Sequence, residues 1–192
     1  MFTGLLLTLA LICLGKSYWI SGKAVVAQLL IANAWQKTLE TGKDTKPWSW
    51  ADTWPVALLI TPEGEEFYVL NSVSGQALAF GPGWIAQSAA PGQQGNVIIA
   101  AHRDTHFQFL ENVQSNESIQ LQDRSGKFYR YSISQMQVVD SRDQTIEIQQ
   151  QTAELTLITC YPFHSLNPGG PLRFVVHARL LTDELVSAAN AY

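Results

Sequence analysis

Three side chains suited to acyl-transfer chemistry stand beside apolar runs of this 192-residue sequence. His102 follows the run Val97–Ala101, and Cys160 follows the run Leu155–Thr159. Arg173 opens a third run of the same texture. Short apolar runs of this kind predict buried strands, and strand ends hold functional side chains rigidly beside loops that form a binding surface. The three residues are therefore candidates for one shared site.

The three residue types complement one another chemically. A cysteine attacks an acyl carbon as the thiolate, whereas a free thiol is mostly protonated near neutral pH. The imidazole of His102 can take up that proton and later protonate a leaving amine. The guanidinium of Arg173 stays charged and offers five N–H donors, so it suits an oxyanion. The backbone N–H of Tyr161 is a candidate for a second donor.

Residue types and spacing leave two interpretations of Cys160 open. A lone cysteine is often a small buried hydrophobe, and a lone histidine or arginine often has only ordinary hydrogen-bonding duties. Other cysteine enzymes fit less well. Papain-like enzymes place the cysteine before the histidine, and the Q-A-C-x-G signature of caspases is absent.

The remaining polar residues around these runs have ordinary interpretations. His106 follows His102 by one helical turn, but no H-E-x-x-H pattern and no third ligand accompany it, so we expect neither a metal nor a cofactor. His177 shares a strand face with Arg173 and is expected to support the structure. Arg103 and Asp104 could contact a substrate, but charged loop residues are usually solvated, and we expect that for both.

The chain from Val56 onward has the pattern of an all-β protein. Short apolar or alternating runs are separated by turn signals such as Pro62-Glu63-Gly64, which is typical of a sandwich or barrel. One helix is expected within Thr105–Val113. The predicted strands are Val56–Ile60, Glu66–Leu70, Asn96–Ala101, Ser118–Leu121, Phe128–Ile133, Gln137–Val139, Leu155–Thr159 and Arg173–Arg179.

The first third of the chain is organised differently. Phe2–Leu14 carries no charge, and we predict an uncleaved membrane anchor over residues 1–21. A helix is predicted from Gly22 to about Glu40, so residues 22–55 form a helical stalk and linker before a catalytic domain over residues 56–192. Lys16 and Lys23 follow the apolar segment, and the positive-inside rule would place the domain in the cytoplasm.

Composition restricts the function further. The net charge is −4 with no block of like charges, so the electrostatic footprint of a nucleic-acid-binding protein is missing. The only cysteines are Cys13, in the apolar segment, and Cys160. Their different surroundings predict a free thiol at Cys160, and two cysteines are too few for a cysteine-rich zinc site.

The sequence around these residues resembles the sortase family over about Val56 to Leu180. The matching segments are Leu155–Cys160 with the signature TLxTC, Cys160–Phe163 with the form TCYPF, Gly95–Arg103 with the segment GN…GHR, Phe109-Leu110 with the helix that follows it, and Arg173–Val176 with the strand of the catalytic arginine. Ala101 stands where sortases usually have glycine.

The resemblance implies a closed eight-stranded β-barrel and a cysteine transpeptidase that cleaves a C-terminal sorting signal of the LPxTG type. Cys160 would carry the thioacyl intermediate, His102 would act as acid and base, and Arg173 would bind the oxyanion or the substrate. Thr159, Tyr161 and His164 are the expected substrate-binding residues. The expected partners are proteins with a sorting signal and an amine acceptor from peptidoglycan or another protein.

Sortases lie at the outer side of the cytoplasmic membrane on one helix, which conflicts with the charge rule but fits an N-terminal anchor. The HRDTHF and TCYPF segments resemble the Gram-negative group, which implies a periplasmic domain. Two alternatives stay open: a membrane-tethered cysteine peptidase that only hydrolyses, and a β-barrel binding module in which Cys160 is inert.

Overall fold

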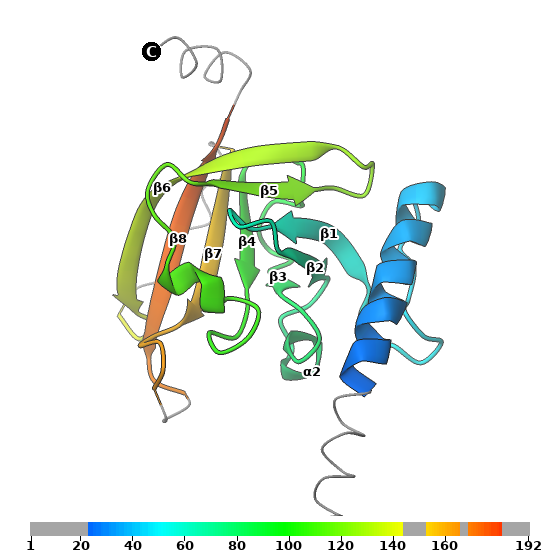
Figure 1. Ribbon diagram of the computed structural model, residues 1–192, viewed down its shortest axis with the longest axis horizontal. Coiled ribbons are helices and arrows are strands. Elements are labelled where there is room, and N and C mark those ends of the chain that lie inside the picture. Colours follow the sequence, from blue (N-terminus) through cyan, green and yellow to red (C-terminus); the bar gives the residue numbers. More distant parts are fainter. Residues whose placement is uncertain (1–22, 144–152, 166–168, 182–192) are drawn as a thin grey trace, which may run out of the picture.

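Eight strands close into one barrel, as predicted. The structure is a computed structural model, and it describes residues 23–143, 153–165 and 169–181. The strand order around the barrel is β1-β2-β3-β4-β7-β8-β6-β5 (Figure 1). The strands are β1 (Pro55–Ile60), β2 (Glu66–Leu70), β3 (Gly83–Trp84), β4 (Asn96–Ala100), β5 (Ser118–Gln122), β6 (Phe128–Asp140), β7 (Glu154–Cys160) and β8 (Leu172–Leu180).

The predicted strand boundaries differ from the observed ones mainly in β6. The sequence suggested two strands there, but one strand pairs with β5 and β8 along its length, and its register with β8 shifts between Ile133 and Gln135. Strand β3 and helix α2 (Gly75–Leu78) are too short to leave a periodic signal. The helix expected over Thr105–Val113 is a single 3-10 turn, η1 (Gln108–Glu111).

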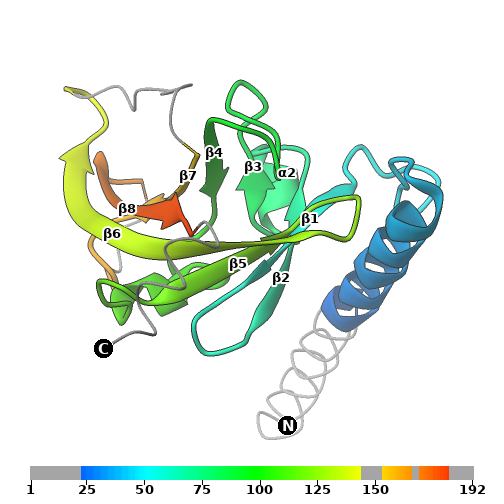
Figure 2. The same cartoon turned by 90° about the horizontal axis from the view of Figure 1, so that it is seen from above.

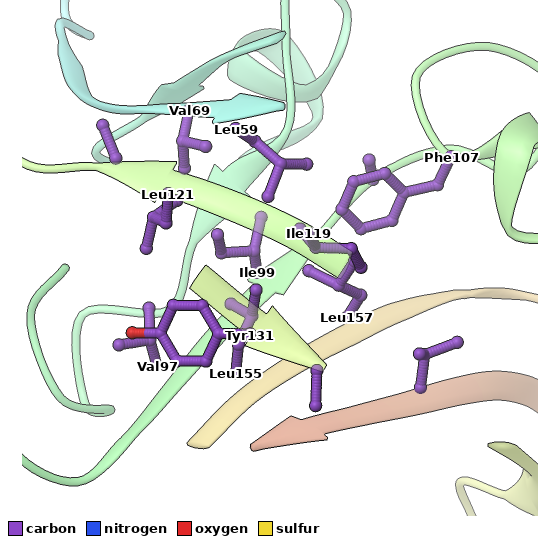
Figure 3. Close-up of a cluster of buried hydrophobic side chains, with 14 of the residues drawn as sticks. Leu59, Val69, Val97, Ile99, Phe107, Ile119, Leu121, Tyr131, Leu155 and Leu157 are labelled. Carbon is purple, nitrogen blue, oxygen red and sulfur yellow. The ribbon is translucent and has the colours of Figure 1, made fainter. Parts of the chain in front are cut away.

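The barrel interior is filled by one cluster of buried apolar side chains. Alternate residues of each strand face it, because successive side chains of a strand point to opposite sides. Figure 3 shows this interior, with Tyr131 and Phe107 among its largest side chains. Its strand residues include Leu59, Val69, Val97, Ile99, Ile119, Leu121, Tyr131, Leu155, Leu157 and Val176.

A second, smaller apolar cluster lies on the opposite face of β4, β6, β7 and β8. Its buried members are Ile98, Val139, Ile158 and Val175. Strands β4 and β7 are therefore apolar on both faces, as is usual for parallel neighbours, and β4 does pair with β7 in parallel.

A helix over residues 23–41 lies along the side of the barrel (Figure 2). Ile31 and Trp35 are fully buried, and the Trp35 indole Nε1 donates a hydrogen bond to Oε1 of Gln122 at 3.3 Å. Gln28 Nε2 donates to the carbonyl of Phe80 at 2.7 Å. The described helix agrees with the one predicted from Gly22 to about Glu40, and these contacts fasten it to the barrel.

The predicted anchor over residues 1–21 lies outside the described residues. Among the residues that are described, no helix combines the length and the apolar character needed to cross a bilayer.

Candidate active site

The parallel pairing of β4 with β7 brings His102 toward Cys160. Ala100 is in register with Ile158, and the Ala101 N–H donates to the Ile158 carbonyl at 3.1 Å, which continues the ladder past the end of β4. Continuing the same register by one more residue places His102 beside Cys160. The backbone segments that carry these two residues, far apart in sequence, therefore lie side by side, because β4 and β7 run in parallel and end together.

Arg173 reaches the same place through the antiparallel pairing of β7 with β8. Cys160 and Arg173 are direct register partners at the end of both strands. The loop that carries His102, the end of β7 and the start of β8 thus converge at one end of the barrel. The sequence analysis expected the three residue types to share a site, and the strand register brings their backbones together.

Cys160 lies on the outer face of β7. Leu155 and Leu157 face the barrel interior, whereas Ile158 belongs to the outer cluster, so the alternation of the strand puts Cys160 on the side of Ile158. Cys160 is a free cysteine and is half-buried. The expectation of a free thiol is confirmed, and the side chain does not belong to the barrel interior.

The guanidinium of Arg173 is held by backbone carbonyls of its own loop. Its Nη1 donates to the carbonyl of Gly170 at 2.6 Å and to the carbonyl of Leu172 at 2.8 Å. A guanidinium carries five N–H groups, so two of them fix its position. Within the described residues its Nε and Nη2 groups make no hydrogen bond, which leaves donors for a ligand.

Thr159 has a different place from the one expected of a substrate contact. Its side chain is only 2% exposed, and its hydroxyl donates to the carbonyl of Ala101 at 2.8 Å. The alternation of β7 turns it away from the face of Cys160. The expected side-chain contact with substrate does not fit this burial, and Thr159 instead supports the residue that precedes His102.

Tyr161 also departs from its expected part. Its backbone N–H donates to the carbonyl of Leu172 at 3.0 Å, so this group is engaged in strand pairing and is not available as an oxyanion donor. The Tyr161 ring stacks on Phe174 with centroids 6.3 Å apart and meets Phe163 edge-on at 6.2 Å. These aromatic contacts fix the start of the loop after Cys160.

His164 lies on the outside of that loop. Its Nε2 is 2.8 Å from Oε2 of Glu111 in η1, and its side chain is 71% exposed. The pair links the loop after Cys160 to the segment after His102. The structure therefore shows His164 in a surface contact beside the candidate site.

Arg103 was expected to be a solvated loop charge, and that expectation is wrong. Its side chain is 6% exposed, and it donates from Nη1 to the carbonyl of Pro162 at 2.8 Å and from Nη2 to the carbonyl of Ser165 at 2.7 Å. A buried guanidinium with two such bonds is an integral part of the site region. The sequence signals were its position next to His102 and its place at the end of the GN…GHR segment.

His106 lies beside the candidate site, four residues after His102. Its ring meets Phe67 edge-on at 5.7 Å. Burial lowers the pKa of His106 below 6.5, and the nearby charge of His102 lowers it further. Both effects favour the neutral form of His106. Within the described part of the chain, no group of three or more His, Cys, Asp or Glu side chains could hold a metal ion.

His177 lies on the outer face of β8, four residues after Arg173 on the same strand. Its Nδ1 is 3.2 Å from the hydroxyl of Thr156 and 3.4 Å from Oε1 of Glu154, and Thr156 in turn donates to Oδ1 of Asn96 at 2.9 Å. This polar chain ties β8 to β7 and β4 behind the candidate site, which agrees with a supporting part for His177.

Comparison with known proteins establishes the class to which this barrel and its cysteine belong. A sequence model of the sortase domain matches residues 59–181, which is more than half of the chain. The chain therefore belongs to the sortase family.

Individual relatives agree with that assignment. Sortase D of Bacillus subtilis (strain 168) is 28% identical over 118 residues, which cover 61% of this chain and 59% of Sortase D. The chain thus spans about three fifths of the length of that curated relative.

Solved structures share the fold. The Clostridium perfringens Sortase D5 transpeptidase superposes with a TM-score of 0.63 at 20% identity, covering 82% of this chain and 99% of that one. Sortase A from Corynebacterium diphtheriae superposes with a TM-score of 0.60 at 23% identity, covering 69% and 63%. At these identities the likeness concerns the fold alone.

Proposed function

We propose that this protein is a sortase-type cysteine transpeptidase that cleaves a C-terminal sorting signal and transfers the new acyl end to an amine. The observation that supports the proposal is that two neighbouring strand pairings bring the ends of β4 and β7 and the start of β8 together, next to the positions of His102, Cys160 and Arg173. Membership of the sortase family supports the same chemistry.

In the first half of the reaction, the Cys160 thiolate attacks the carbonyl carbon of the threonine in an LPxTG-like motif. Arg173 donates to the oxyanion through the N–H groups that are not bound to loop carbonyls. Protonated His102 gives its proton to the departing amine as the C–N bond breaks. The products are a thioester on Cys160, a released peptide with a free amino group, and a neutral imidazole.

In the second half, an acceptor amine attacks the thioester carbonyl. Neutral His102 accepts a proton from the attacking nitrogen, and the C–S bond breaks to regenerate the thiolate. Water in place of the amine gives hydrolysis by the same route. The acceptor we propose is an amino group of peptidoglycan or of another protein, and the donor is a protein with a C-terminal sorting signal.

A peptide assay tests the proposal directly. The full chain is incubated with an LPxTG-containing peptide, with and without an excess of a glycine-terminated amine, and the products are identified by mass spectrometry. The proposal expects an amine-dependent ligation product and an acyl adduct on Cys160. In Cys160→Ala we expect both to disappear, with a reduction of at least about a thousandfold, while the circular dichroism spectrum is unchanged.

Two results would favour the alternatives. Cleavage without an amine product under any nucleophile would indicate a peptidase that only hydrolyses. An unchanged function in Cys160→Ala would indicate a binding module.

We further propose that residues 1–21 anchor the protein in the cytoplasmic membrane, as a single pass with the barrel on the outer, periplasmic side. The charge-free sequence Phe2–Leu14 supports this. The helix that follows also supports it, because Val25 and Leu29 on its first turns are 62% and 61% exposed, and exposed apolar side chains favour contact with lipid.

Fractionation and labelling test the location. We expect the full chain to stay in the membrane pellet after carbonate extraction. In a Cys13→Ala background, a membrane-impermeant thiol reagent should label Cys160 in spheroplasts with intact inner membranes. Labelling that requires lysis would place the barrel in the cytoplasm and contradict the proposal.

A further inference from the structure

We propose that Arg103 is a positioning residue that holds the loop after Cys160 against the segment that carries His102. The inference rests on the proposed function, because it concerns the alignment of the proposed nucleophile and acid–base group. It concerns a side chain that contacts neither of them in the reaction.

The contacts of Arg103 span the two halves of the site. Its own backbone follows His102 directly, while its acceptors, the carbonyls of Pro162 and Ser165, belong to the loop that follows Cys160. Two terminal nitrogens of one rigid, planar group reach two carbonyls at 2.8 and 2.7 Å. This fork restrains both the distance and the angle between the two segments.

Burial makes these bonds strong and their loss costly. The Arg103 side chain is 6% exposed, and its Nε lies 3.3 Å from Oδ1 of Asp104, whose side chain is 66% exposed. Hydrogen bonds from a charged donor are stronger than neutral ones, and a buried guanidinium that loses its acceptors is expensive. The loop conformation therefore depends on a guanidinium at this position.

A second arginine holds the other end of the same loop. Arg173 donates to the carbonyls of Gly170 and Leu172, so both ends of the chain between β7 and β8 are fixed by guanidinium groups. Arg173 keeps its Nε and Nη2 groups for further hydrogen bonds, whereas the Arg103 side chain is buried. We therefore assign ligand contact to Arg173 and alignment to Arg103.

An ordinary stabilising role for Arg103 would predict different consequences. It would lower the free energy of unfolding but leave the reactivity of the folded molecule unchanged. A positioning role predicts slower chemistry in the folded molecule, because a displacement of about 1 Å in a reacting pair can cost about a hundredfold. Lysine separates the two cases, since it keeps the charge but has a single terminal nitrogen in place of the fork.

The experiment compares Arg103→Lys with wild type and with Arg124→Lys in the full chain. Arg124 is a matched control, because it is a half-exposed arginine that pairs with Asp44 at 3.5 Å on the surface. Two rates are measured at pH 7 and normalised to the folded fraction: kcat for amine transfer, and the rate of Cys160 alkylation by iodoacetamide, followed on the Cys160 peptide by mass spectrometry.

For Arg103→Lys we expect kcat to fall by about 10- to 100-fold and the alkylation rate to change at least about threefold, with the KM for the amine unchanged. Arg124→Lys should match wild type in every measurement. Wild-type kcat and alkylation in folded Arg103→Lys would overturn the inference.

A second variant and the alkylation measurement cover the cases in which Arg103→Lys does not fold or the wild type does not transfer an amine. If Arg103→Lys does not fold, Arg103→Gln is measured at 15 °C, and failure of both variants to fold would assign Arg103 to stability and reject the positioning role. Absence of amine transfer in wild type would refute the proposed function. The alkylation arm does not depend on that activity and would still test the alignment.

Discussion

The two faces of strand β7 have different tasks. The residues that point into the barrel, Leu155 and Leu157, are fully buried in its apolar interior. The residues on the other face pass from polar Thr156 through apolar Ile158 to the free thiol of Cys160. One strand therefore carries part of the barrel core on one side and, on the other, buried supporting residues followed by the proposed nucleophile.

The difference shows how the two-residue alternation of side chains along a strand can place a proposed functional residue on one face and core residues on the other. Each side chain of β7 differs from its neighbour by one position and faces the opposite environment. A slip of one residue in the register would bury Cys160 and expose the leucines. Parallel pairing with β4 and antiparallel pairing with β8 both fix that register. Because burial of the leucines favours the same register, the residues that stabilise the barrel also determine where the thiol lies.

The largest test of this comparison is Leu157→Ala on the inner face. Leu157 is fully buried, and removing its side chain should lower the free energy of unfolding by about 2–5 kcal/mol. Urea unfolding followed by tryptophan fluorescence measures the loss. Amine transfer per folded molecule should stay within about twofold of wild type, and a much larger loss would show that the two faces are coupled.

Thr156→Val asks whether the outer face away from Cys160 is structural. Thr156 is fully buried, and its hydroxyl donates to Asn96 Oδ1. Valine removes the donor at nearly constant volume and leaves a buried acceptor unsatisfied, so we expect a loss of about 1–3 kcal/mol in urea unfolding. If the stability does not change while transfer falls, Thr156 belongs to the reactive region and the division on this face is wrong.

His106→Gln tests whether the segment between β4 and η1, which also carries His102, contributes to stability in a pH-dependent way. The pKa of His106 is lowered from 6.5 by burial and then by His102, so the unfolded chain binds this proton at a higher pH than the folded one. Stability from this group is present above pH 6.5 and is lost as the pH falls toward the folded-state pKa.

The slope for one proton is at most about 1.4 kcal/mol per pH unit. Urea midpoints at pH 7.5 and 5.5 should therefore differ less in His106→Gln than in wild type. An identical difference in the two proteins would remove His106 as the source.

The smallest expected effect is that of Glu111→Gln, which removes the charge from the surface contact with His164. Because the His164 side chain is 71% exposed, the contact should contribute less than about 1 kcal/mol to unfolding. Thermal unfolding at 20 and 500 mM salt checks this. A larger, salt-independent loss would mean that this surface contact contributes as much as the buried one of Arg103.

The sequence predicted the parts of the fold that have a periodic signal. Six of the strands could be located because apolar alternation and turn residues mark them, and the positions of His102, Cys160 and Arg173 at strand ends follow from the same pattern. Strand β6 was divided in two because its residues Ser134–Gln137 are mostly polar, and only pairing with β8 shows that they continue the strand.

The contacts that set the site could not be predicted, because their acceptors are backbone carbonyls. Nothing in the letters near Arg103 indicates that Pro162 and Ser165, about sixty residues later, will present carbonyls to it. The engagement of the Tyr161 N–H likewise depends on cross-strand register. The burial of Thr159 could have been predicted from the sequence, because neighbouring residues of a strand face opposite sides and Thr159 directly precedes Cys160.

Closure of the barrel has a consequence for how a peptide is captured. Proteins with an open sheet can bind an extended peptide as an additional strand, through the free N–H and C=O groups of the sheet edge. Here β1 pairs with both β2 and β5 and so completes the ring. The described strands thus form a closed ring, and only the edge of β2 that faces β3, where the pairing is limited to Leu70 with Gly83, leaves room for such an addition. For the proposed peptide substrate we therefore expect selectivity to come mainly from side chains and connecting segments at the end of the barrel, which makes those segments the natural targets for redesigning the preferred peptide.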